Sequence, residues 1–203
     1  MKQTTLPLVG SFADIQKFST IAIDCVPWKE EYPYKPEVSA ALAHTDKAIL
    51  VRFSVRQNAL RAVCTEANGH VWEDDCVEFF VKAPGSPFYC NFETNCLGVG
   101  LSAIRRSRED FKHFDAAKHA LVLRRSSLPA EPVDKTGDCA WTLELEVPFA
   151  VLDCPEKPET LLANFYKCGD GTATPHFVSW NPIGTAKPDF HCPEYFGELK
   201  LEW

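Results

Sequence analysis

Two glutamates near the middle of the chain, Glu78 and Glu93, could act together on a ligand. Residues 76–82 (CVEFFVK) predict a strand, and residues 88–97 predict the strand that returns after the turn APGSP. A turn centred between the Gly and the Ser of that segment places Glu78 opposite Glu93. Because like charges facing each other across a sheet are destabilising, the pair indicates a cation, a shared proton or a hydrogen-bonding ligand.

Other side chains accompany this pair. Because side chains alternate between the faces of a strand, Asn91 and Asn95 share a face with Glu93, and Trp72 lies in the loop that precedes the first strand. A register shifted by two residues would instead place Glu78 opposite one of the asparagines. A polar hairpin face turned to water would need no ligand at all, and the pattern leaves these alternatives open.

Paired carboxyl groups also suit glycoside hydrolysis. One carboxyl acts as an acid and the other as a nucleophile or base, about 5–5.5 Å apart for retention and about 6.5–9.5 Å apart for inversion. A direct cross-strand pair meets the shorter spacing, and the neighbouring charge would raise the pKa of one member. A glycoside hydrolase that uses Glu78 and Glu93 as catalytic residues is therefore the enzymatic alternative.

The elements that must position these residues are strands. Residues 48–55 and 140–147 alternate between apolar and polar side chains, as a half-buried strand does. Further strands are expected at 21–26, 38–44, 60–64, 98–104, 121–125, 161–167, 176–180 and 195–202. Loops are expected at 30–36, at 105–118 (or a short helix) and at 130–138, and one helical turn at 148–152. Many short strands separated by turns predict a single all-β domain over residues 1–203, an antiparallel β-sandwich.

Composition and charge exclude several classes of protein. The chain has 203 residues, of which 45% are hydrophobic, so it can bury a sizeable core. A net charge of −7 repels phosphate backbones, and we expect no nucleic-acid partner. No apolar run approaches the ~20 residues that span a bilayer, so no membrane association is expected. The opening residues MKQTTLPLVG lack the apolar segment of a signal peptide, which favours the cytoplasm.

The chain contains nine cysteines, an odd number, and no C-x-x-C motif. Several fall inside predicted strands, where a reduced cysteine behaves as a small apolar residue. We therefore expect free thiols, as is typical of a reducing compartment. A zinc site formed by Cys168, His176, His191 and Cys192 is the alternative, although its spacing matches no known zinc-binding pattern.

Several segments occur in an order that resembles a known family. They are WEDDCVEFFV (72–81), NFE (91–93), WTLELEVPF (141–149), HFVSWNPI (176–183) and PDFHCPEYFGEL (188–199). From about Ile21 onward, the set resembles the carbohydrate-binding module family 9-like proteins, which are related to modules attached to xylanases. The resemblance implies a jelly-roll or immunoglobulin-like β-sandwich with one site that recognises a mono- or oligosaccharide at a chain end, in carbohydrate catabolism.

The resemblance also implies roles for individual residues. In the xylanase modules, two tryptophans stack on either side of a terminal sugar. Trp72 matches the first, and Trp180, beside Asn181, is the match for the second, although its pattern is equally typical of a core tryptophan. Glu78 matches a glutamate that accepts hydrogen bonds from sugar hydroxyls. The second hairpin strand supplies further polar contacts, here from Asn91, Glu93 and Asn95.

The chain departs from the family pattern in one respect. The resemblance leads us to expect a basic residue on the second hairpin strand, but none occurs between Lys82 and Arg105. The xylanase modules also hold structural calcium, for which Asp74 and Asp75 are the candidate ligands here. Because the expected basic residue is missing, a structural or interaction domain whose sugar site has decayed is a third alternative.

Overall fold

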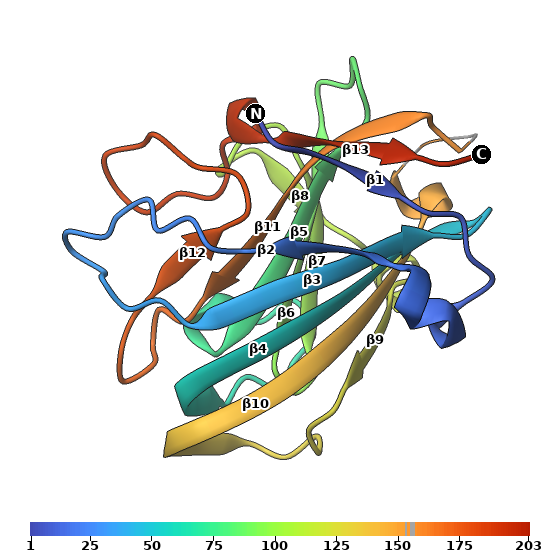
Figure 1. Ribbon diagram of the computed structural model, residues 1–203. Helices are drawn as coiled ribbons and strands as arrows, with labels where there is room; N and C mark the ends of the chain where they lie inside the picture. The colour runs from blue at the N-terminus through green and yellow to red at the C-terminus, as the bar shows by residue number, and fades with distance from the viewer. Residues whose placement is uncertain (153, 155–156) are drawn as a thin grey trace.

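Two β-sheets packed face to face form the protein (Figure 1). The computed structural model describes residues 1–152, 154 and 157–203. The larger sheet has the strand order β1-β13-β11-β5-β6-β7-β8, with β12 paired to β11, and the smaller has the order β2-β3-β4-β10-β9. Among the described strands, only β1 and β13 pair in parallel. The predicted antiparallel β-sandwich is confirmed.

The larger sheet contains β1 (Gln3–Leu6), β5 (Cys76–Lys82), β6 (Tyr89–Asn95), β7 (Gly100–Arg105), β8 (Phe111–His113), β11 (Thr160–Cys168), β12 (Phe177–Ser179) and β13 (Gly197–Leu201). The smaller sheet contains β2 (Ser19–Ala22), β3 (Glu37–His44), β4 (Ala48–Ala62), β9 (Leu123–Ser126) and β10 (Val133–Pro148). The connections hold the helix α1 (Ala116–Ala120) and the 3₁₀ helices η1 (Phe12–Lys17), η2 (Val71–Glu73), η3 (Phe149–Leu152) and η4 (Pro193–Tyr195).

Most predicted strands are present, but several of their ends differ, and the predicted strand 21–26 is β2, which ends at Ala22. The predicted strands 48–55 and 60–64 are one strand, β4, and the predicted connection 130–138 belongs largely to β10. The end of β4 and the start of β10 pair with each other. The register shifts between Thr136 and Cys139, where Gly137 adopts a positive φ. The segment 105–118 contains β8 and the start of α1, and β1 was not predicted.

The core lies between the two sheets. The apolar faces of residues 48–55 and 140–147 both point into it, as their alternation predicts. Phenylalanine rings from the larger sheet stack beneath them: Phe79 lies 4.9 Å from Phe165 and 6.2 Å from Phe92, between ring centroids. Core packing therefore holds the apolar face of the hairpin toward the smaller sheet. As a result, the side chains of its polar face point outward.

The outer face of the larger sheet is also covered. A second apolar cluster lies there, in which Phe80 and Tyr166 pack with Phe177 of β12 and with Trp28 and Phe190 from the connecting segments. As a result, all residues of β6 are buried. The alternative of a polar hairpin face turned to water is therefore wrong, because loops cover that face.

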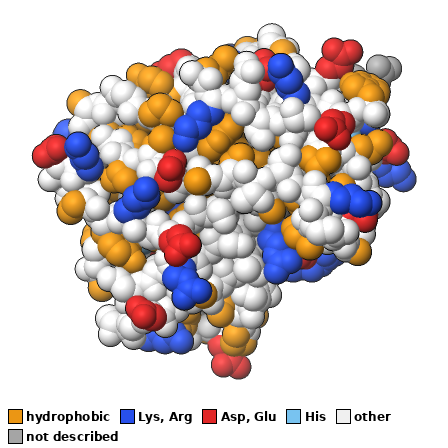
Figure 2. All heavy atoms as spheres, viewed as in Figure 1, with side chains coloured by type: hydrophobic (Ala, Val, Ile, Leu, Met, Phe, Trp, Pro, Cys, Tyr) orange, Lys and Arg blue, Asp and Glu red, His pale blue; other side chains and the backbone are white. Residues whose placement is uncertain are grey.

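The described part of the chain has no helix with the length and apolar character that crossing a membrane requires. Figure 2 shows the surface from the same side as Figure 1, with acidic and basic side chains scattered among uncharged ones.

Candidate functional site

The hairpin of β5 and β6 has the predicted register, with Glu78 opposite Glu93. Both strands lie inside the larger sheet, between β11 and β7, and the connecting turn has a positive φ of 76° at Gly85. The two glutamate side chains share the outer face of the sheet and are 3% and 4% exposed. Two buried carboxyl groups are thus held on neighbouring strands whose positions are set by the core below.

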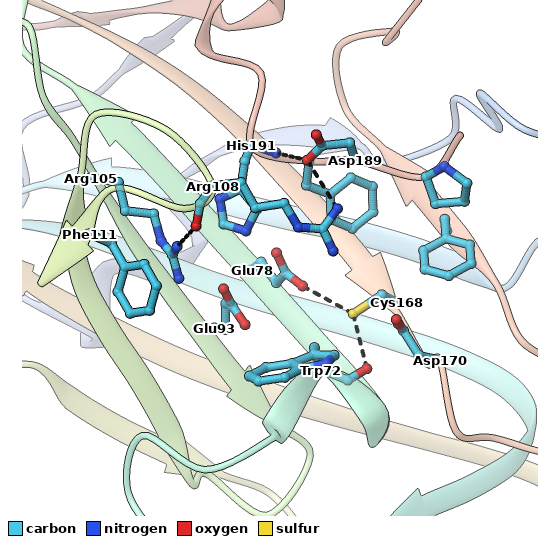
Figure 3. A pocket seen from close by; sticks show the side chains of 13 residues that line it. Trp72, Glu78, Glu93, Arg105, Arg108, Phe111, Cys168, Asp170, Asp189 and His191 are labelled. Carbon is cyan, nitrogen blue, oxygen red and sulfur yellow. Dashed lines mark hydrogen bonds and ion pairs between the residues drawn. The ribbon is translucent and has the colours of Figure 1, made fainter. Parts of the chain in front are cut away.

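A pocket of about 280 Å³ opens above these glutamates (Figure 3). In the view of Figure 3, the indole of Trp72 and the guanidinium of Arg108 lie on opposite sides, with Glu78 and Glu93 between them. The pocket is lined by Trp72, Glu78, Glu93, Arg105, Arg108, Phe111, Cys168, Asp170, Phe177, Pro188, Asp189, Phe190 and His191. It therefore combines aromatic surface with groups of both charges.

The two glutamates have raised pKa values. Burial, reinforced by the charge of Glu93, raises the pKa of Glu78 well above its usual range, against a hydrogen bond of 3.0 Å from the Cys168 thiol. Burial raises the pKa of Glu93 to about 7, while Arg105 and a hydrogen bond of 2.8 Å from the Asn91 amide act in the opposite direction. A carboxyl that titrates near neutral pH can donate or accept a hydrogen bond.

Arg105 brings a basic group to the pocket from the end of β7 rather than from β6. Its Nε donates to Asn91 Oδ1 over 2.8 Å, and its guanidinium also donates to the backbone oxygen of Arg108 over 2.8 Å. The side chain packs over the ring of Phe111, 4.2 Å from the centroid. The basic residue that is missing from β6 thus has a counterpart in the pocket on the neighbouring strand, β7.

Trp72 is held in place through the backbone of η2. Its carbonyl oxygen accepts hydrogen bonds from Asp170 N over 3.2 Å and from Cys168 Sγ over 3.6 Å. Its half-buried indole stacks against His70 with 4.6 Å between centroids. The sequence places Trp72 near the hairpin, and the structure brings it into the pocket wall with Glu78 and Glu93.

The two asparagines predicted with the glutamates do not line the pocket. Asn91 lies beneath it and links Glu93 to Arg105 by two hydrogen bonds. Asn95 is fully buried at the other end of β6, where its amide donates to Asp74 Oδ2 over 3.0 Å and its oxygen accepts from two backbone N–H groups. Asn91 therefore supports the pocket, whereas Asn95 shapes the turn between β6 and β7.

The structure places Trp180 and Asn181 away from Trp72. Trp180 is 3% exposed and lies in the core between the sheets, 5.7 Å from the ring of Phe165. Asn181 is buried, and its side chain bonds to the backbone of Lys2 and Tyr195. The assignment of Trp180 as the second stacking tryptophan is therefore corrected, because its side chain points inward from the sheet.

Asp74 and Asp75 do not fit a calcium site, because protein donors occupy their oxygens. Asp74 accepts hydrogen bonds from the side chain of Arg61 and from the backbone N–H groups of Val63 and Cys64. Asp75 accepts from Arg61 N over 2.7 Å and from the buried ammonium of Lys167 over 2.8 Å. The carboxylates instead fasten the end of β4 to the larger sheet.

The predicted alternative zinc ligands are also separated. His176 bonds to the ammonium of Lys167, and His191 bonds to the hydroxyl of Tyr89 over 3.0 Å. Among the described residues, the grouping that brings three ligand atoms together is a different one, formed by Cys76, Glu78 and Cys168.

Sequence reasoning missed most of the pocket wall. Arg105 could have been found by extending the hairpin register to the next strand, since β7 pairs Arg105 with Tyr89 and thereby puts it on the face of Glu93. Residues 188–191 were noted only as part of a motif. No local signal brings that loop over the sheet, because its position depends on packing between distant segments.

Comparison with known proteins identifies the family. A model of carbohydrate-binding family 9 matches residues 8–201, so the chain belongs to this family. A crystal structure of a candidate carbohydrate-binding protein from Bacteroides uniformis is 39% identical in sequence, with a TM-score of 0.92 and 99% of each chain covered. No curated protein matches the chain.

More distant structures share the fold. A family 9 carbohydrate-binding module from Caldicellulosiruptor kristjanssonii in complex with cellotriose gives a TM-score of 0.61 at 13% identity, covering 99% of this chain and 94% of that one. A family 9 module from the same organism in complex with glucose gives 0.59 at 14% identity, covering 99% and 96%.

Proposed function

We propose that the pocket beside Trp72 binds a mono- or oligosaccharide by a chain end, in carbohydrate catabolism. The observation that carries this proposal is a half-buried indole beside two buried glutamates and an arginine, in a chain of carbohydrate-binding family 9. The cellotriose and glucose complexes of distantly related modules support the choice of ligand class.

The chemistry of the pocket suits a pyranose. The C–H face of a sugar ring packs on an indole, and its hydroxyls need fixed donors and acceptors. Glu78 and Glu93 supply carboxyl oxygens, and Arg105 supplies N–H groups that its bonds to Asn91 and Arg108 hold in place. Because these groups are already ordered, binding costs little side-chain entropy.

The shape of the pocket favours an end of a chain over its middle. Its volume of about 280 Å³ is at the small end for a ligand site, and Arg108 and Asp189 form an ion pair of 3.8 Å at its wall. Among the described residues, one tryptophan lines it, so the sugar would stack on Trp72 alone and meet polar and phenylalanine side chains opposite.

Isothermal titration against a panel of mono- and oligosaccharides tests the proposal. Replacing the indole in Trp72→Ala should weaken binding by about tenfold or more, which corresponds to ~1.4 kcal/mol or more. Trp203→Ala is the matched control, because Trp203 is 74% exposed and does not line the pocket. No heat from any sugar in the panel would contradict the proposal.

Glycoside hydrolysis by Glu78 and Glu93 is the second candidate, and the raised pKa values of both groups favour it. The hairpin strand β6 is also buried, which limits contact between Glu93 and solvent. We propose binding first because the fold of a family does not by itself carry catalysis. Prolonged incubation with aryl glycosides separates the two: product that disappears in Glu78→Gln would establish the hydrolase.

A further inference from the structure

A cluster of two thiols and a carboxyl lies at the floor of the pocket. Cys76 and Cys168 are directly opposite each other on β5 and β11, and Glu78 follows two residues after Cys76 on the same face. The sulfur atoms and a carboxyl oxygen all lie within 4.8 Å of one another. The three side chains are 0%, 2% and 3% exposed.

The carboxyl of this cluster is buried without an ion pair among the described residues. Its Oε1 accepts a hydrogen bond from the Cys168 thiol, a weak donor, over 3.0 Å. Buried carboxylates are ordinarily paired or bound to a metal. Apart from the bond between Cys168 and Glu78, the hydrogen bonds of the two thiols to backbone oxygens are long, with Sγ-to-oxygen distances of 3.6 Å from Cys76 to Val77 O and from Cys168 to Trp72 O.

We propose that Cys76, Cys168 and Glu78 form a binding site for a thiophilic divalent cation, with zinc as the ion that their chemistry favours. Two sulfurs and one carboxylate oxygen are ligands that zinc accepts, and zinc binds them about 2.0–2.3 Å from the metal. Tetrahedral geometry then sets the ligand atoms about 3.3–3.8 Å apart. In the cluster, Cys168 Sγ and Glu78 Oε1 are 3.0 Å apart, and all three ligand atoms lie within 4.8 Å of one another. Small side-chain rotations would therefore bring them to the distances that zinc requires.

The fourth coordination position opens toward the pocket, because Glu78 and Cys168 line it. Binding releases the thiol protons, two for two thiolates, and burial raises the pKa of both thiols. Metal affinity therefore increases with pH. A bound ion engages Glu78, so the ion and a saccharide compete for the same carboxyl.

Cadmium is the probe, because its bonds to thiolate absorb in the ultraviolet. Titration of the reduced, metal-free full chain should give one saturable equivalent of this absorption. Cys76→Ser and Cys168→Ser should each remove it. Cys139→Ser should keep it, because Cys139 lies on β10 and a serine hydroxyl can replace its hydrogen bonds to Gln57 O and Ala59 O.

Cadmium-113 NMR of the wild type provides a measurement that does not depend on the folding of any variant. The chemical shift reports the number of sulfur ligands, and two are expected. A shift for one or no sulfur, or absorption that is equal in the Cys168→Ser variant, would overturn the proposal. Neither measurement contains sugar, so its outcome is independent of saccharide binding. If both sites exist, prior saturation with zinc should lower the saccharide affinity by about tenfold or more.

Discussion

At the scale of single residues, the pocket holds two carboxyl groups in a buried environment that disfavours their ionised form. Glu78 and Glu93 face each other across two strands, and both have raised pKa values because they are buried. Their neighbours compensate only in part, through Arg105, Asn91 and Cys168. Such an arrangement is typical of a binding or catalytic site, because a structure selected for stability alone would avoid it.

The first prediction concerns Glu78. If its carboxyl bonds to sugar hydroxyls, Glu78→Gln keeps the shape and removes the stronger acceptor. A sugar hydroxyl that loses its hydrogen-bond partner in a buried site costs about 1–3 kcal/mol, so affinity should fall by about fivefold or more in calorimetric titration. Glu194→Gln, in η4 and outside the pocket lining, should bind like the wild type. Unchanged affinity in Glu78→Gln would place the ligand elsewhere.

The second prediction concerns Glu93 and pH. Its pKa is about 7 in the folded protein and near the ordinary 4.5 when unfolded, so the folded state holds its proton more tightly. The resulting stability is present below pH 4.5 and is lost as pH rises through 7. Glu93→Gln removes this loss. The free energy of unfolding of this variant should therefore change less between pH 5 and 8 than that of the wild type, with a difference of up to roughly 3 kcal/mol.

Urea denaturation at several pH values measures this difference. The control is Glu66→Gln, which changes an exposed carboxyl outside the pocket and should leave the pH profile unaltered. A Glu93→Gln profile as steep as that of the wild type would show that another group carries the dependence.

At the scale of elements, the hairpin and Trp72 could be predicted, and the register extends to Arg105, but the position of the loop at residues 188–191 could not. The Val- and Phe-rich strand, the Pro-Gly turn and strict alternation fixed both strands and the facing glutamates from local pattern alone. The sequence could not predict whether Trp180 lies in the core or at the site, because Ser179 and Asn181 flank it with polar side chains. All three residues are buried. Strand β10 was predicted too short because its first residues are polar and interrupted by Gly137, yet pairing with β4 keeps them extended.

The third prediction follows from the packing of β13. A Cβ on Gly197 would lie 2.5 Å from the Trp180 ring and 2.7 Å from the backbone oxygen of Lys2. Gly197→Ala should therefore lower the free energy of unfolding by about 1–3 kcal/mol, because neither neighbour can move freely. Gly10→Ala is the control, since its nearest neighbour is the Asp14 side chain at 3.4 Å. Equal stability of the two variants in urea would contradict this packing.

At the scale of the whole molecule, the N-terminal segment joins the two sheets. Strand β1 belongs to the larger sheet through β13, and the next residues bond to the end of β3, with Val9 N and His44 O 2.9 Å apart and His44 N and Pro7 O 3.0 Å apart. Leu6 is fully buried in the shared core. One short segment thus links the edge of the larger sheet to the end of β3 in the smaller sheet (Figure 1).

The fourth prediction tests this link. Leu6→Ala leaves a cavity in the shared core and should lower the free energy of unfolding by about 2–5 kcal/mol. Leu8→Ala, only two residues away but 41% exposed, should change it by less than about 0.5 kcal/mol. Denaturation curves of the two variants compare these effects directly. A similar loss of stability in both would show that burial of Leu6 in the shared core does not account for the contribution of this segment.

The parallel pairing of β1 with β13 has a consequence for how the chain is made. The pairing joins Gln3 to Glu198, so this contact closes a very long loop. Contacts of such separation slow folding. During synthesis, β1 leaves the ribosome before β13 and must wait for this partner. Strand β1 therefore stays without its sheet partner until β13 has been made, and protection of its backbone N–H groups would report that the larger sheet has closed at this edge.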